Sequence, residues 1–231
     1  MSAPSEHSAL PAAVLWDMDG TLVDTEPLWN AVQRPLVEEH GGRWSEELAA
    51  SLVGRPLDEG ARRLQEAGLD LPVEEIIALT MGEVARGVAD APPWRPGAHE
   101  LLTAQAEACV PGALVTMSHA PLARVLAEQA PAGALRVVVT GDEVAAGKPD
   151  PEAYRLALAR LAEHVPGLAA EDCVVVEDSP VGVAAATAAG LPTVGVPSML
   201  PLDDGAATVR WDTLAGRTLA DLAAVRPGGR R

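Results

Sequence analysis

The spacing of apolar and polar residues predicts an alternation of strands and helices. Short apolar runs that predict buried strands occupy residues 12–16, 113–116, 136–140, 173–177 and 193–196. Apolar residues recur every three or four positions, as on one face of a helix, at residues 99–109, 121–130, 151–164, 180–189 and 219–225. Strands that alternate with helices in this way predict an α/β fold with a doubly wound parallel sheet and right-handed crossovers.

The alternation is interrupted once, directly after the first strand. Helical periodicity without any strand pattern fills residues 24–40, 46–52, 57–67 and 73–88. Pro35 is expected to kink or divide the first of these helices. A helical stretch of this length between two strands predicts an inserted α-helical cap domain. The segment 91–98 holds three prolines and is the expected return hinge, with Gly97 making a turn into the next helix.

These patterns divide the chain into predicted parts. We expect a core domain of residues 12–25 and 94–225, a cap domain of residues 26–93, and disordered tails at residues 1–11 and 226–231. Sheets of this class bind ligands at the carboxyl ends of their strands. The residues that follow the strands are therefore the candidates for function.

Composition and charge narrow the class of protein. The chain has 231 residues, which is enough for one α/β domain with an insertion. It contains no apolar run of membrane-spanning length and no secretory signal pattern at its start, so a cytoplasmic location without a membrane partner is expected. The net charge of −16 argues against a nucleic-acid partner. Cys109 and Cys173 lie in apolar stretches and are expected to be buried, reduced thiols. The pattern does not predict an oligomeric state.

Two carboxylates follow the first strand. Asp17 and Asp19 are two residues apart, a spacing that directs both side chains to one side of an extended chain, and Gly20 allows a sharp turn after them. At about 4 Å, two such charges repel by about 4 kcal/mol at an effective dielectric constant near 20. A bound cation would offset this repulsion.

Further polar residues follow the other predicted strands. Thr116 ends the second strand, and Met117 and Ser118 come next. Lys148, the only lysine in the chain, lies in the sequence G-K-P-D-P after the third strand. The fourth strand ends in an acidic pair formed by Glu177 and Asp178. Together with Asp17 and Asp19, this pair places four carboxylates at one edge of the sheet, which is unfavourable without a divalent ion.

These motifs resemble those of the haloacid dehalogenase superfamily of phosphohydrolases. The family signature D-x-D-G-T is matched by Asp17, Asp19, Gly20 and Thr21, and all four family motifs occur in the family order within residues 12–197. The sequences D-T-E-P-L-W and E-D-S-P-V-G are similar to those of its phosphoglycolate phosphatase and β-phosphoglucomutase-like subgroup. The resemblance implies a Rossmann-like core with a helical cap.

The resemblance also implies catalytic roles for four residues. Asp17 would be the nucleophile that becomes a phosphoaspartate. Asp19 would be the general acid and base that protonates the leaving oxygen and then activates water. Thr116 would donate a hydrogen bond to the transferring phosphoryl group. Lys148 would hold Asp17 and the phosphoryl oxygens together by its positive charge.

Mg²⁺ is the cofactor that the resemblance implies. Its ligands would be Asp17, the backbone carbonyl of Asp19, and Asp178, with Glu177 bound directly or through water. Ligands that offer only oxygen atoms suit this ion. The implied substrate-binding residues are Gly20, Thr116, Met117, Ser118, Lys148 and Arg55.

The function implied by the resemblance is Mg²⁺-dependent hydrolysis of a small phosphorylated metabolite, either a sugar phosphate or a molecule like phosphoglycolate. A β-phosphoglucomutase-like phosphomutase is an alternative. That branch has a histidine where this chain has Trp29, and a cap arginine where Leu57 stands here, although Arg55 could replace the arginine. A receiver-like phospho-switch is a non-enzymatic alternative, but receiver domains are about half this length and lack the helical insertion.

Overall fold

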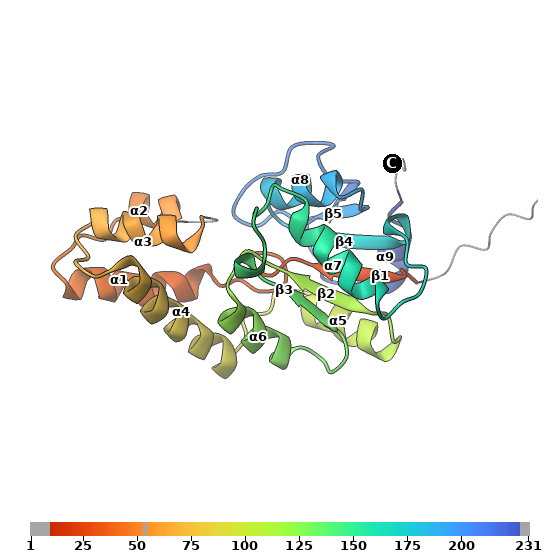
Figure 1. Ribbon diagram of the computed structural model, residues 1–231, viewed down its shortest axis with the longest axis horizontal. Coiled ribbons are helices and arrows are strands. Elements are labelled where there is room, and N and C mark those ends of the chain that lie inside the picture. The colour runs from red at the N-terminus through yellow and green to blue at the C-terminus, as the bar shows by residue number, and fades with distance from the viewer. Residues whose placement is uncertain (1–9, 53–54, 227–231) are drawn as a thin grey trace, which may run out of the picture.

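The computed structural model describes residues 10–52 and 55–226 (Figure 1). Its sheet has parallel strands in the order β3-β2-β1-β4-β5-β6. The strands are β1 Ala13–Trp16, β2 Gly112–Val115, β3 Val137–Val139, β4 Cys173–Glu177, β5 Thr193–Gly195 and β6 Val209–Arg210. This sheet confirms the predicted α/β class. The sequence did not predict β6, because a strand of two residues carries no readable apolar pattern.

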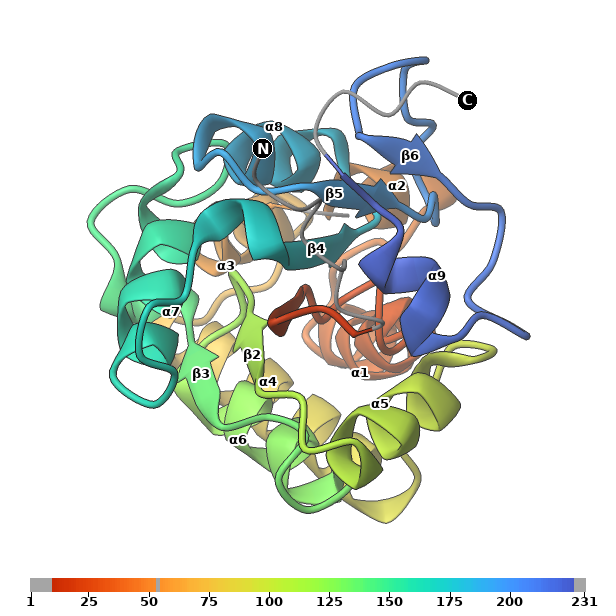
Figure 2. The same ribbon diagram turned by 90° about the vertical axis from the view of Figure 1, so that its right-hand side faces the viewer.

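Helices cover both faces of the sheet. They are α5 Ala98–Glu107, α6 Ala120–Gln129, α7 Glu152–Ala162, α8 Pro180–Ala188 and α9 Leu219–Ala223, with short 3₁₀ turns η1 Gly141–Glu143 and η2 Ala170–Asp172. Alternate residues of a strand point to opposite faces. Val14 and Trp16 therefore pack with α5, α6 and α9, whereas Ala13 and Leu15 pack with α7 and α8. Figure 2 shows these two sets of helices on opposite sides of the sheet.

The helical block, residues 26–93, lies beside the sheet (Figure 1). Its helices are α1 Glu26–Glu39, α2 Glu46–Leu52, α3 Leu57–Glu66 and α4 Val73–Asp90. The block has an apolar cluster of its own, formed by Val37, Ala61, Leu64, Leu69 and Ile76. Val84 and Val88 of α4 belong instead to the cluster on one face of the sheet, where α4 packs against α6. The boundaries of a separate cap domain stay a prediction.

The chain leaves the sheet for the helical block and returns along two adjacent segments. The amide of Asp24 donates to the carbonyl of Pro93 at 2.9 Å, and the amide of Arg95 donates to the carbonyl of Leu22 at 2.8 Å. The guanidinium of Arg95 donates a further hydrogen bond to the carbonyl of Gly20. The return segment is thereby attached to the loop that follows β1.

Some of the predictions made for single residues are confirmed by the structure, and one is wrong. Gly97 makes the expected turn into α5, with φ of +88°. Pro35 does not divide α1, which runs without a break from Glu26 to Glu39. Cys173 is buried as expected, but the expectation for Cys109 is wrong: this residue is exposed. It follows the last turn of α5 with φ of 55°, and the buried apolar residue at this point is Val110.

Parts of the two predicted tails, residues 1–9 and 227–231, lie outside the described residues, as do residues 53–54. Within the described ranges, no helix is long and apolar enough to span a bilayer.

Candidate active site

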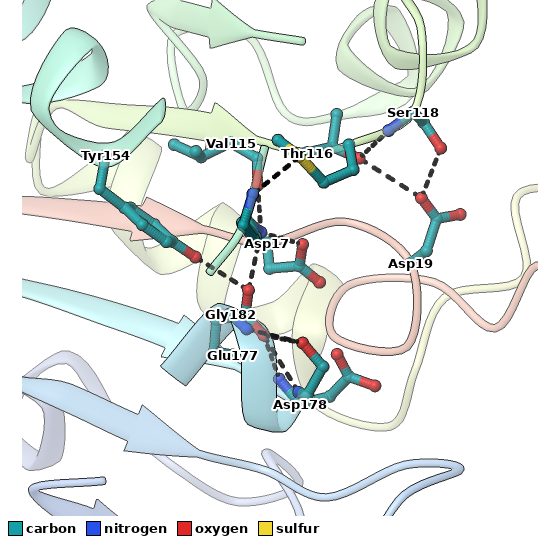
Figure 3. Close-up of polar contacts among 12 residues, drawn as sticks. Asp17, Asp19, Val115, Thr116, Ser118, Tyr154, Glu177, Asp178 and Gly182 are labelled. Atoms are coloured by element: carbon teal, nitrogen blue, oxygen red, sulfur yellow. Dashed lines mark hydrogen bonds and ion pairs between the residues drawn. The ribbon is translucent and has the colours of Figure 1, made fainter. Parts of the chain in front are cut away.

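The predicted site residues meet at the carboxyl edge of the sheet (Figure 3). Asp17 directly follows β1, and Thr116 directly follows β2. Lys148 lies in the loop between β3 and α7, and Glu177 is the last residue of β4. Because all four strands are parallel, their carboxyl ends lie at the same edge. The order of the strands thus brings together side chains that are far apart in the sequence.

Lys148 is the central cation of this site. Its Nζ lies 2.6 Å from Asp17 Oδ1, 2.7 Å from Glu177 Oε1 and 2.9 Å from the carbonyl oxygen of Val115. These contacts use all three ammonium hydrogens, and the side chain is only 3% exposed. Burial alone would lower the pKa of Lys148, but the charges of Asp17 and Glu177 outweigh it and hold this pKa well above its usual value.

Three buried carboxylates are grouped at this site. Asp17, Glu177 and Asp178 each offer an oxygen, and these oxygens lie within 4.8 Å of one another. Burial, together with the charge of Glu177, raises the pKa of Asp17 to about 7. Burial, together with the charges of Asp17 and Glu177, raises the pKa of Asp178 to about 9. Three carboxylates and one ammonium have a net charge of −2 when ionised, which suits one divalent cation.

The three carboxylates differ in how their oxygens are used. Glu177 Oε1 accepts from Lys148 at 2.7 Å and from the Tyr154 hydroxyl at 3.0 Å. Its Oε2 accepts from the amides of Asp178 and Ser179, both at 3.0 Å, and from the Ser179 hydroxyl at 3.1 Å. In the part of the chain that the structure describes, no donor reaches Asp17 Oδ2 or either oxygen of Asp178. Asp17 Oδ2 and the two oxygens of Asp178 are therefore the ones available to a metal ion.

Asp19 lies apart from this cluster, and its side chain faces hydroxyl groups (Figure 3). It accepts from Thr25 Oγ1 at 2.5 Å, from Ser118 Oγ at 2.7 Å and from Thr116 Oγ1 at 3.4 Å. The Asp19 carboxylate is not among the grouped oxygens of Asp17, Glu177 and Asp178. Asp17 and Asp19 both lie in the loop after β1, but their side chains have different hydrogen-bond partners.

Gly20 has a positive φ of +85° and a carboxylate packed against it. A Cβ atom at this position would lie 2.1 Å from Oδ2 of Asp178, so a larger residue would strain the backbone and displace this carboxylate. Met117 Sδ accepts a hydrogen bond from the backbone amide of Lys148 at 3.3 Å. The sequence predicts that Gly20 and Met117 bind substrate. In the structure, Gly20 leaves room for the Asp178 carboxylate, and Met117 contacts the backbone of Lys148.

Within the described ranges, Arg55 contacts none of the other candidate site residues. Its guanidinium donates to the carbonyl oxygen of Ser51 at 2.5 Å and to Glu59 at 3.3 Å, and it remains largely exposed. Both contacts are local to α2 and α3. The substrate-binding role of Arg55 therefore stays a prediction.

Sequence reasoning missed several residues that complete the site. Thr25 lies six positions after Asp19, in the turn before α1. It is the second residue of D-T-E-P-L-W, but no role in the site was predicted for it. Tyr154 and Ser179 contact Glu177. Tyr154 looks like an ordinary helix residue in the sequence, and Ser179, within E-D-S-P-V-G, is the N-cap of α8. The quoted motifs were an available signal for Thr25 and Ser179, and for Tyr154 the one signal was that it is the only tyrosine of the chain.

Comparisons with known proteins agree with this geometry. A family model described as haloacid dehalogenase-like hydrolase matches residues 11–190. The chain is 35% identical to "Phosphorylated carbohydrates phosphatase" of Thermotoga maritima, over 88% of this chain and 92% of that protein. It is also 35% identical to "Hexitol phosphatase A" of Escherichia coli, over 79% of this chain and 81% of that protein.

Solved structures share the fold. The structure of CbbY from Rhodobacter sphaeroides in complex with phosphate has a TM-score of 0.78 and 28% identity, covering 92% of this chain and 99% of that one. A putative β-phosphoglucomutase from Thermotoga maritima has a TM-score of 0.67 and 33% identity, covering 86% of this chain and 93% of that one. The match over residues 11–190 and these relatives confirm the resemblance: the chain belongs to the haloacid dehalogenase-like hydrolase family.

Proposed function

We propose that this protein is a Mg²⁺-dependent phosphatase that hydrolyses a small phosphorylated metabolite, a sugar phosphate or a phosphoglycolate-like molecule, through a phosphoaspartate on Asp17. One observation carries the proposal. Asp17 is held by Lys148 at 2.6 Å through one oxygen, while its other oxygen has no donor among the described residues. A carboxylate held in this way is oriented and still has a free oxygen for attack. The names of the two phosphatase relatives support the same reaction class.

The first half of the reaction transfers the phosphoryl group to Asp17. Oδ2 of Asp17 forms a bond to phosphorus, and the bond between phosphorus and the leaving oxygen breaks. Lys148 offsets the charge on the reacting oxygens, and the Thr116 hydroxyl would donate to the phosphoryl group. Asp19 gives its proton to the leaving oxygen, which departs as an alcohol.

The second half regenerates the enzyme. Asp19, now a carboxylate, takes a proton from water while the water oxygen attacks phosphorus. The bond between phosphorus and Asp17 breaks, and inorganic phosphate leaves. For both steps Asp19 must turn from the hydroxyls of Thr25 and Ser118 toward the reacting group.

The buried oxygens fit a Mg²⁺ ion. Asp17 and Asp178 would hold it, the backbone carbonyl of Asp19 would be a further ligand, and Glu177 would contribute its negative charge from the surroundings. When bound, the ion offsets the charge of the carboxylates and of the phosphoryl oxygens. The oxygens of Glu177 already accept five hydrogen bonds, which favours an indirect role for this residue.

A phosphomutase is the second candidate, favoured by the similarity to a putative β-phosphoglucomutase. Trp29 argues against this function. It is partly buried against the apolar cluster that contains Val14 and Trp16, and its side chain cannot exchange a proton as a histidine does. Membership of a hydrolase family leaves the receiver-like switch without support. The expected cytoplasmic location and the expected absence of a nucleic-acid partner stay predictions.

The proposal is tested by release of phosphate from a panel of phosphorylated metabolites. Turnover is expected with Mg²⁺, and it should disappear after exhaustive treatment with a chelator and return when Mg²⁺ is added, because the ion offsets the charges of the carboxylates and the substrate. Full activity in the chelated protein would remove the metal from the mechanism. Conversion of a sugar 1-phosphate to its 6-phosphate isomer, without release of phosphate, would favour the mutase.

Metal-free protein is expected to lose stability as pH rises. The pKa of Asp178 is about 9 in the fold and near 4 in an unfolded chain, so its protonated form is favoured by folding. The contribution is complete below about pH 4 and is lost as pH rises through about 9. A divalent ion replaces the proton at high pH. Calorimetry should therefore show a larger rise in Tm on adding Mg²⁺ at pH 8.5 than at pH 6, and an equal rise at both would contradict this account.

A further inference from the structure

Tyr154 is a buried polar residue for which the reaction described above has no use. It lies on α7 and has no exposed surface. Its hydroxyl donates to Oε1 of Glu177 at 3.0 Å, and the centre of its ring lies 5.1 Å from Nζ of Lys148 (Figure 3). It therefore contacts two residues of the site without reaching Asp17 or Asp19 by any hydrogen bond in the described residues.

Glu177 is held in a single orientation by groups on several sides. Its Oε2 accepts from the amides of Asp178 and Ser179 and from the Ser179 hydroxyl. Its carboxylate also lies directly against Gly182, where a Cβ atom would be 1.6 Å from Oε1. With Oε2 fixed by the turn after β4, Oε1 can face only Lys148 and Tyr154.

The donors on Oε1 differ in their mobility. Lys148 has a long, flexible side chain that can shift toward Asp17 or the Val115 carbonyl. The phenol of Tyr154 is attached to a rigid ring in a packed core, so it is the fixed donor of the pair. Buried acceptors that lose a donor are costly, which makes this contact a strong constraint on Glu177.

We propose that Tyr154 is a positioning residue: it fixes Oε1 of Glu177, which in turn fixes the ammonium of Lys148 beside Asp17. Its effect on turnover rests on the proposed function. Its effect on Lys148 does not, and the two can be measured separately. The conservative change Tyr154→Phe removes the hydroxyl and keeps the ring, so it isolates this one contact.

The direct measurement is the accessibility of Lys148. Because Lys148 is the only lysine of the chain, its reaction with acetic anhydride can be followed by mass spectrometry of one peptide. In the Tyr154→Phe variant we expect the rate of acetylation to rise at least about tenfold, the lower end of the factor that corresponds to the loss of one hydrogen bond to a charged group. For p-nitrophenyl phosphate we expect kcat to fall about tenfold while KM stays within about twofold, since Tyr154 does not touch the substrate.

Thr193→Val is the matched control. Thr193 is also fully buried, and its hydroxyl donates to the carbonyl of Leu191 at 3.0 Å, outside the site. This variant should lose stability without a change in acetylation of Lys148. Equal acetylation rates in Tyr154→Phe and wild type would overturn the inference, and so would an equal rise in both variants. If wild type releases no phosphate, the proposed function fails, but the acetylation rates still decide the role of Tyr154.

A second measurement serves if Tyr154→Phe does not fold. Biosynthetic 3-fluorotyrosine labels position 154 alone, because the chain has a single tyrosine. Its ¹⁹F resonance in the folded protein is expected to move when Lys148→Met removes the ammonium that shares Oε1 with the phenol. A resonance that stays in place in a folded Lys148→Met protein would show that phenol and ammonium are not coupled through Glu177, and the inference would be wrong.

Discussion

Asp17→Asn is expected to lower turnover by several orders of magnitude while the fold is retained. Asparagine has nearly the same shape as aspartate but lacks the anionic oxygen that would attack phosphorus. Lys148 keeps its contacts with Glu177 at 2.7 Å and with the Val115 carbonyl at 2.9 Å, so the ammonium stays partnered in the variant. Loss of one buried negative charge also relieves repulsion with Asp178.

Phosphate release and circular dichroism, measured side by side, check this expectation. Asp212→Asn is a suitable control, since it makes the same chemical change at an exposed position outside the site. The control should retain wild-type turnover. A folded Asp17→Asn protein that still hydrolysed its substrate would count against the whole catalytic assignment.

Asp19→Asn is expected to separate the two halves of the reaction. In Asp19, Oδ1 accepts from Thr25 and Oδ2 accepts from Ser118. Asparagine keeps one of these oxygens, and its NH₂ group can donate to the hydroxyl on the other side, so the side chain retains its resting position. It cannot give a proton to the leaving oxygen or take one from water. General acid and base catalysis contributes about a hundredfold to ten-thousandfold, and hydrolysis of an alkyl phosphate should fall by at least that factor.

The phosphoenzyme should accumulate in the Asp19→Asn variant. A donor with a good leaving group, such as acetyl phosphate or p-nitrophenyl phosphate, needs less help from an acid in the first step, while the second step still lacks its base. Mass spectrometry of the variant after exposure to such a donor and Mg²⁺ should reveal the added phosphate. Unchanged activity, with no phosphate on either the variant or wild type, would refute the roles given to Asp17 and Asp19.

Much of the site was predictable because topology decides it. Once strands alternate with helices, the carboxyl ends of parallel strands must share one edge. Asp17, Thr116, Lys148 and Glu177 could therefore be grouped without any knowledge of distances. The bounds of β1 to β5 were equally accessible, since short apolar runs between turn residues mark them well, whereas β6 is too short to leave such a run.

Contacts that depend on packing were not predictable. The sequence gives no reason for the Tyr154 hydroxyl to meet Glu177, because the rotation of α7 about its axis decides which residue faces the site. In the same way, helical periodicity in α4 indicates one apolar face, but it cannot tell that Val84 and Val88 lie against α6 and the sheet. Cys109 was misplaced for a related reason, since its neighbours in sequence are apolar but its backbone turns it outward.

The paired segments that lead into and out of the helical block restrict how its helices can be exchanged among relatives. Residues 22–24 and 93–95 hydrogen-bond to one another, and Arg95 reaches the carbonyl of Gly20 in the loop that carries Asp19. A chimera joined beyond these segments, at residues 25 and 92, would carry a foreign set of helices on an intact native junction. Joined at residues 20 and 97, the same transplant would replace the junction itself, and the loop that carries Asp19 would have to be rebuilt together with the new helices.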